Sequence, residues 1–262
     1  MNILKSFRLI LPAILSFVGL SLAAQNIAPQ PISGKNATKD YIQENLIYPT
    51  TDLENGNSGN VVISMHIDKE GKASQFAVKS TFSEEASPIA MHLVKTTLWK
   101  PATHNGIAIE SDHDYTVEFS AKSYKRYWKR HERYGFEAAM EADSSYVIYE
   151  NRQLEESPRF NLANGKNLSQ YIYSNLKYPA EAKEREIQGT VRIEFVIETN
   201  GNVSNINIIN SVGGGCDNEA IRLIKETHWI PGTKNGKYVR CHSMQDITFS
   251  IGNRNFQDGN SY

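Results

Sequence analysis

The segment YIQENLIYP at residues 41–49 returns as YIYSNLKYP at residues 171–179, an offset of 130 positions. The match continues without a gap from residue 41 to residue 120, and about 24 of those 80 pairs are identical. An internal repeat of this length predicts one fold used twice. The repeated landmarks include Gly59/Gly189, Gly71/Gly201, Trp99/Trp229, Pro101/Pro231 and Gly106/Gly236.

Both copies predict the same order of elements: helix, helix, strand, strand, helix, strand. The first helices, 38–46 and 168–176, carry apolar residues at helical spacing and stop at Tyr-Pro, because proline cannot continue a helix. The second helix is predicted at 180–186, with a weaker counterpart at 50–57. Period-2 alternation and turn glycines predict the strands, which are 61–67, 73–80 and 110–119 in the first copy and 191–197, 203–210 and 239–249 in the second.

The third helix of each copy follows a polar pair, Ser87-Pro88 or Asp217-Asn218. Serine and aspartate are favoured N-caps, so we expect these helices to be capped by Ser87 and Asp217. The economical packing is an α+β fold of two tandem modules, each with a small antiparallel three-stranded sheet and helices on one face.

The first 24 residues resemble a secretory signal peptide. Lys5 and Arg8 precede an apolar run at residues 9–24, which ends in small residues before Gln25. The run is shorter than the ~20 residues of a spanning helix and contains Pro12, so cleavage and export to the periplasm are expected. An uncleaved anchor in the inner membrane is the alternative.

Composition narrows the function further. The net charge of −1 gives no overall attraction to nucleic acid. The chain has two cysteines, Cys216 and Cys241. Export permits a disulfide between them, but the first copy has Ala86 and Ser111 in those columns, which favours two buried thiols.

Residues 178–240 carry a set of motifs: Tyr-Pro, a Gly-x-Val strand, a turn glycine, Gly-Gly-Gly-Cys-Asp before a helix, and Trp-x-Pro-Gly-x-x-Asn-Gly. This run resembles the C-terminal domain of TonB, in the version common in Bacteroidetes. The resemblance covers 146–251, while the copy at 32–120 keeps the scaffold but lacks the glycines and the cysteine near residue 85. The residues that carry the signature are Tyr178, Pro179, Gly189, Gly201, Gly213, Gly214, Gly215, Cys216, Trp229, Pro231 and Gly236.

The resemblance implies binding of an extended peptide, such as the N-terminal segment of an outer-membrane receptor, as a strand added beside the last strand of the domain. This requires an unpaired sheet edge. If only one copy binds, the copy with the full signature is expected to be the binder. The implied contact residues alternate along the last strand and form two sets: Arg240, His242, Met244 and Asp246, or Cys241, Ser243, Gln245 and Ile247.

TonB also has a membrane anchor and a long arm. Here residues 25–37 alone precede the first module, and thirteen residues reach at most ~45 Å. We therefore expect a periplasmic binding protein. Two alternatives stay open: an anchored energy transducer, and an assembly protein whose two modules pair their edges with each other. A homodimer is a further option.

The connector at 121–145 is rich in basic and aromatic residues. Its charges favour a solvated helix over a surface for nucleic acid or anionic membrane, although a membrane contact stays open. The Gly-Gly-Gly run predicts a tight turn, because it lacks the Gly-Lys-Ser/Thr of a phosphate loop. No histidine motif of a zinc peptidase and no Gly-x-Ser-x-Gly occurs. We therefore expect no enzyme activity, metal or cofactor. The tail at 252–262 is predicted to be mobile.

Overall fold

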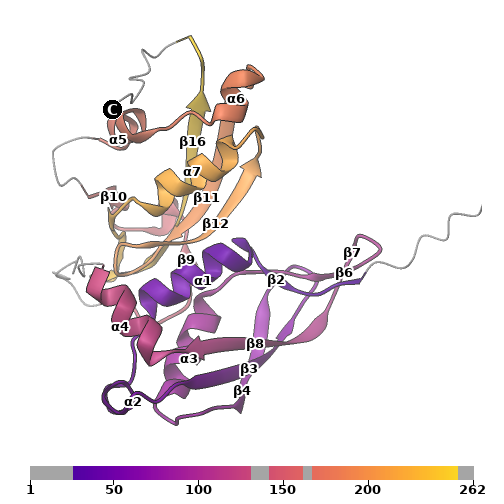
Figure 1. The fold of residues 1–262 in the computed structure, drawn as a ribbon, viewed down its shortest axis with the longest axis vertical. Coiled ribbons are helices and arrows are strands. Elements are labelled where there is room, and N and C mark those ends of the chain that lie inside the picture. Colours follow the sequence, from indigo (N-terminus) through magenta and orange to yellow (C-terminus); the bar gives the residue numbers. More distant parts are fainter. Residues whose placement is uncertain (1–25, 131–141, 162–166, 253–262) are drawn as a thin grey trace, which may run out of the picture.

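The computed structural model describes residues 26–130, 142–161 and 167–252. Figure 1 shows two halves stacked along the long axis of the molecule. The expected signal peptide at 1–24 and nearly all of the expected tail lie outside the described residues. The elements of the first half are β1 (Asn26–Ile27), β2 (Gln30–Pro31), α1 (Gly34–Asn45), α2 (Thr50–Asn55), β3 (Gly59–Ile67), β4 (Ala73–Ser80), α3 (Ala86–Thr96), β5 (Trp99–Lys100), β6 (Ala102–His104), β7 (Ile107–Ile109), β8 (Ser111–Phe119) and α4 (Ala121–Arg130).

The second half repeats this order after a different entry segment. Its elements are β9 (Ile148–Tyr149), the 3-10 turn η1 (Asn151–Gln153), β10 (Arg159–Phe160), α5 (Leu168–Asn175), α6 (Ala180–Glu184), β11 (Gly189–Ile197), β12 (Val203–Asn210), α7 (Cys216–Lys225), β13 (Trp229–Ile230), β14 (Thr233–Lys234), β15 (Lys237–Tyr238) and β16 (Arg240–Phe249). The predicted helices and strands are therefore present, within a few residues at their ends.

Each half closes its own core between one face of its sheet and its helices. Alternate residues of β3, from Val61 to Ile67, are buried against α3, and the same positions of β11 are buried against α7. Period-2 burial on a strand and a buried stripe on a helix explain why these segments fold together. The predicted mixed α+β fold is confirmed.

The sheets differ in one respect from the prediction. The first half has the expected antiparallel order β4-β3-β8, but the second half has four strands in the order β12-β11-β16-β9. The added strand β9 pairs parallel with Arg240 and Cys241, at the start of β16. Three strands were expected because β9 has only two residues, too few to show a periodic pattern.

The two sheets share their register at the offset of the repeat. Gly59 pairs with Phe119, and Gly189 pairs with Phe249. Both hairpins are also irregular at equivalent positions, where Gln75 and Asn205 adopt positive φ angles of 53° and 49°. The repeat in the sequence is therefore a repeat of strand pairing, down to the position of the bulge.

The Tyr-Pro motif closes each module. The ring of Tyr178 packs edge-on against Phe249, and its hydroxyl donates to the carbonyl of Ile187 at 2.7 Å. Tyr48 makes the equivalent ring contact with Phe119 and donates to the carbonyl of Asn57. The phenol thus satisfies a loop carbonyl while the ring fills the core, which is the usual role of a buried tyrosine.

The expected N-caps at Ser87 and Asp217 are wrong. The N-cap residues of α3 and α7 lie two residues earlier, at Glu85 and Gly215, and make no side-chain cap bond. The Asp217 carboxylate instead accepts the N–H of Val212 at 3.0 Å and the hydroxyl of Ser211. Asp217 therefore closes the loop before the helix. Its side chain bonds the backbone of that loop instead of capping the helix.

The Gly-Gly-Gly run is a tight turn between β12 and α7, as predicted. Its three residues, Gly213 to Gly215, have φ values of +79°, +58° and +86°. The equivalent residues of the first half, 83–85, are not glycines and adopt no positive φ. Because α3 still forms, the glycine turn is one local solution for this connection and is not required by the fold.

The hairpin glycine of each half sits against the tryptophan that follows the third helix. A Cβ at Gly201 would lie well inside van der Waals contact of the Trp229 carbonyl oxygen, and the Gly201 carbonyl accepts the Trp229 N–H at 2.9 Å. Gly71 makes the same close approach to the Trp99 carbonyl. Both glycines also have positive φ, so no other residue fits this position without strain.

We therefore expect Gly201→Ala to lower the free energy of unfolding by about 2 kcal/mol or more, from backbone strain and from the clash together. The matched control is Gly236→Ala. Gly236 also has positive φ but has open space at its Cβ, so about 1 kcal/mol is expected. Urea unfolding followed by circular dichroism measures both values. Equal losses would contradict the close approach to Trp229.

Candidate functional site

The two halves are joined by a buried polar cluster. Asn205 on β12 donates from Nδ2 to the Thr96 carbonyl at 2.9 Å and accepts the Leu98 N–H at 2.7 Å. These are the last residue of α3 and a residue just beyond it, so Asn205 takes the place of the backbone partner that a helix end lacks. The positive φ of Asn205 directs this side chain across the junction between the halves.

Arg240 completes the cluster from the start of β16. Its guanidinium makes two hydrogen bonds to the Glu198 carboxylate, at 2.8 and 2.9 Å. It also donates to the carbonyls of Thr96 at 2.8 Å and Tyr146 at 3.1 Å. Both charged side chains are nearly fully buried. Burial alone would lower the pKa of Arg240, but the hydrogen bonds and charge of Glu198 raise it overall.

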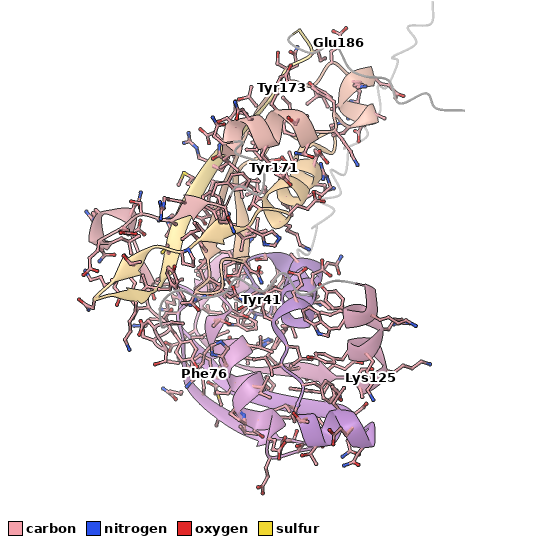
Figure 2. The ribbon with its side chains drawn as sticks, turned by 90° about the vertical axis from the view of Figure 1, so that its left-hand side faces the viewer. Tyr41, Phe76, Lys125, Tyr171, Tyr173 and Glu186 are labelled. Carbon is pink, nitrogen blue, oxygen red and sulfur yellow. The ribbon has the colours of Figure 1, made fainter. Side chains whose placement is uncertain are left out.

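Tyr41 on α1 lies at the same junction, as Figure 2 shows. Its hydroxyl meets the Thr96 hydroxyl at 3.1 Å, and burial together with the nearby Glu198 raises its pKa. Around the rim, Lys225 pairs with Asp40 at 2.6 Å. The junction therefore combines buried, hydrogen-bonded charges with an exposed salt bridge, and only the buried part is expected to fix the geometry.

The predicted binding strand β16 is open over most of its length. Arg240 and Cys241 are covered by β9, but from Ser243 to Phe249 the described residues provide a strand neighbour on one side only, which is β11. The expected unpaired edge is therefore present, shorter at its beginning than predicted. An open edge of this kind can accept another strand.

The two alternate sets of β16 residues face opposite sides of the sheet. Burial alternates so that Ile247 and Phe249 point into the core with Cys241, whereas Met244 and Asp246 are exposed on the other face. Arg192 on β11 donates two hydrogen bonds to the Asp246 carboxylate, both at 2.7 Å. This pairing lowers the pKa of the Asp246 carboxyl.

Three of the eight residues in the two predicted sets are buried. The Arg240 side chain is buried in the junction, and the Cys241 and Ile247 side chains are buried in the core, so none of them can face a ligand. Of the others, His242 lies 3.4 Å from Glu150 and 3.6 Å from Glu194. Met244, Gln245 and Asp246 lie along the open part of the strand. Arg240 was misjudged because its partners come from distant segments.

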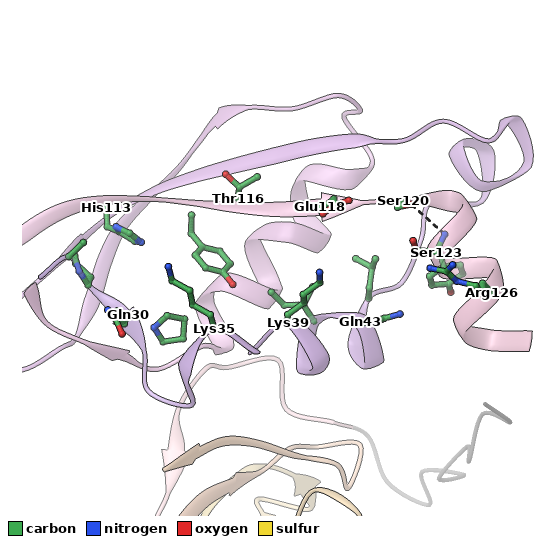
Figure 3. A pocket seen from close by; sticks show the side chains of 17 residues that line it. Gln30, Lys35, Lys39, Gln43, His113, Thr116, Glu118, Ser120, Ser123 and Arg126 are labelled. Atoms are coloured by element: carbon green, nitrogen blue, oxygen red, sulfur yellow. Dashed lines mark hydrogen bonds between the residues drawn. The ribbon is translucent and has the colours of Figure 1, made fainter. Parts of the chain in front are cut away.

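Sequence reasoning missed a groove in the first half. It has a volume of about 650 Å³ and runs along the outer edge of β8. The residues that line it are Ala28, Pro29, Gln30, Pro31, Lys35, Lys39, Ile42, Gln43, Leu46, His113, Tyr115, Thr116, Glu118, Ser120, Ser123, Tyr124 and Arg126. They come from the N-terminal segment, α1, β8 and α4, and Figure 3 shows Lys35 and Lys39 rising from α1 toward β8. The lysine spacing Lys35-x-x-x-Lys39 on one helix face was its only signal in the sequence.

The described part of the expected connector is helical. In α4, Ala121 is buried and Tyr124 packs against Tyr48, while Lys122 and Lys125 are exposed. Residues 121–130 form the predicted helix, and its basic residues from Lys122 to Lys129 are exposed. Residues 131–141 lie outside the described residues. Arg126 is the basic residue of α4 that also lines the groove.

Cys216 and Cys241 are both buried, free thiols within the core of the second half. Burial raises both pKa values, to about 11 for Cys241. The favoured interpretation of the sequence, two separate thiols, therefore matches the structure. Each packs as a small apolar residue.

Residues 174–251 match the family of Gram-negative bacterial TonB protein C-terminal domains. The matched segment is less than a third of the 262 residues and runs from the end of α5 to just past β16. No curated protein matches the chain. Within the described residues, no helix is both long and apolar enough to cross a membrane. A TonB-type domain is typical of the Gram-negative envelope, and the match contains the whole of the open strand β16.

We expect Arg240→Met to lower stability by about 3 kcal/mol, because it leaves the Glu198 carboxylate buried without its cation. Arg192→Met removes an equally close, exposed ion pair and should lose about 1 kcal/mol or less. The double variant Arg240→Met/Glu198→Met should recover much of the loss, because no buried charge remains. Urea midpoints measure the series, and equal losses in the two single variants would refute the buried cluster.

Both thiols should resist modification in the folded protein. At pH 8, well below the raised pKa of Cys241, the thiolate that reacts is scarce and the sulfur is shielded. Ellman's reagent should therefore label neither cysteine under native conditions and both in concentrated urea. Rapid labelling of one cysteine in the folded protein would contradict this expectation.

Proposed function

We propose that the chain is a peptide-binding protein of the cell envelope, acting in the periplasm and linked to outer-membrane transport. Its ligand is an extended segment of another envelope protein, such as the N-terminal segment of an outer-membrane receptor. The segment binds as a strand added beside β16. Binding of this kind needs no catalytic group, so we propose no enzyme activity.

The single observation that carries the proposal is the open edge of β16 between Ser243 and Phe249, inside the segment that matches the TonB family. Main-chain N–H and C=O groups at such an edge supply most of the affinity for an added strand. Seven residues at about 3.3 Å each offer a site about 23 Å long. Within the described residues this stretch has no second strand neighbour, although the Asp246 carbonyl accepts the Gln245 side-chain amide at 2.8 Å. Its length distinguishes this edge from a surface that binds by side chains alone.

β9 limits where the ligand can lie. It occupies the edge beside Arg240 and Cys241, so an added strand must end or turn away at that point. On the solvent-exposed face of the sheet the ligand would lie next to Met244 and Asp246. Alternate residues of the ligand would contact this exposed face, which gives side-chain specificity.

We also propose that the first half is a second, divergent module of the same family. The shared register at an offset of 130 and the shared bulge support this. The assembly alternative, in which the two modules pair their edges, has less support, because β8 and β16 are not paired with each other in the described part of the chain. The anchored-transducer alternative depends on residues 1–24.

Titration with synthetic receptor N-terminal peptides tests the function. Binding should slow amide hydrogen exchange of β16 residues 243–249, since their free N–H groups become bonded. The measurement is hydrogen–deuterium exchange with peptide-level mass spectrometry.

A pair of N-methylated peptides provides the control. Methylation of one set of alternate amides should abolish binding, and methylation of the other set should leave it nearly unchanged, because only alternate N–H groups of an added strand face its neighbour. Equal effects of the two sets, or no protection of β16, would reject strand addition at this edge.

A further inference from the structure

We propose that the groove beside β8 is a second binding site, and that its ligand is an extended peptide segment carrying carboxylates on alternate residues. The site lies in the first half, outside the segment that matches the TonB family. It goes beyond the proposed function, because it adds a separate site with a ligand of defined charge.

The strand β8 has one paired edge and one open edge. Its inner edge pairs with β3 over all nine residues from Ser111 to Phe119. In the described part of the chain, no backbone hydrogen bond reaches its outer edge. The outward-facing N–H and C=O groups therefore line one wall of the groove. Only a ligand with its own extended backbone can satisfy such a row of alternating donors and acceptors.

The wall of the groove opposite β8 is positively charged. Lys35 and Lys39 project from α1, and Arg126 comes from α4 at the far end. Among the residues described here, none of the three has an ion-pair partner, whereas other lysines do, such as Lys79 with Asp114. These three cations outnumber the one carboxylate that lines the groove, Glu118, so the recess has a net positive charge that attracts carboxylates.

The floor of the groove, between β8 and α1, carries two polar side chains. His113 and Tyr115 lie on the inward face of β8, where their polar ends make no hydrogen bond with another described residue. Burial keeps the pKa of His113 low, against the opposing effect of Asp114, and raises the pKa of Tyr115. Both groups are therefore neutral near pH 7 and able to hydrogen-bond a ligand carboxylate.

Strand geometry then separates the two faces of the ligand. Side chains of an added strand alternate between the groove and the outer face of the sheet. Those facing the groove meet Lys35, Lys39 and the apolar side chains of Ile42 and Leu46. Those facing outward lie beside Glu118, so acidic residues are unfavourable there. An acidic residue at every second position fits this division.

The test uses fluorescence anisotropy with the full chain and two labelled probes. One is a nine-residue peptide that alternates glutamate with valine, and the other replaces each glutamate with lysine. We expect the glutamate probe to bind and the lysine probe to bind at least tenfold more weakly. Affinity for the glutamate probe should fall as salt is raised, because ions screen the exposed charges. Equal affinity for the two probes would overturn the proposal.

Two charge-reversal variants locate the site. Lys35→Glu/Lys39→Glu should weaken binding of the glutamate probe at least tenfold, and both side chains are exposed, so folding should be kept. The matched control is Lys177→Glu/Lys183→Glu, two exposed lysines in the second half, which should leave the affinity within about twofold. A similar loss in both variants would show that net charge alone drives binding, and would overturn the site.

Hydrogen exchange separates this site from the edge of β16. The glutamate probe should protect β8 and leave residues 243–249 unchanged. Protection of β16 alone would overturn the groove while supporting the proposed function. Protection of β8 alone, with no receptor peptide protecting β16, would support the groove and reject the proposed function.

Discussion

The arrangement of the two halves depends on the buried guanidinium of Arg240. It neutralises Glu198, bonds the end of α3 in the first half and holds the segment that leads into the second half through the Tyr146 carbonyl. A positive charge at a helix C-terminus is favourable, and here it is shielded from solvent. All three contacts are made by the same guanidinium, so the junction has one geometry in which the buried charge is satisfied.

This constraint determines which part of each edge is accessible. Tyr146 leads directly into β9, so the bond from Arg240 to Tyr146 also fixes the short strand that covers the start of β16. The groove of the first half lies between α1 and β8, and α1 itself contacts β12 across the junction. The same helix therefore supports the junction with one face and presents Lys35 and Lys39 with another.

The sequence repeat predicted the local features of the fold but not the contacts between distant segments. Strand positions and turn glycines follow from two aligned copies, because each depends on local pattern and on features that both copies keep. The N-caps were misjudged because Asp217 bonds a loop instead of its helix. β9, the role of Arg240 and the groove depend on contacts between distant segments, and the two copies differ at those positions. The alternating pattern of β16 does not show that Arg240 is buried, because its burial depends on partners outside the strand.

The junction also makes the two halves non-equivalent. A head-to-tail contact between similar modules can be repeated indefinitely unless a residue at one end prevents it. The first half has Glu110 in the column of Arg240, and the second half has Glu226 in the column of Thr96. Glu110 cannot supply the guanidinium of Arg240, and the Glu226 carboxylate is already paired with Arg222 at 2.7 Å. The two halves are therefore not interchangeable at the junction, because only the second half carries the cation that bonds the end of α3.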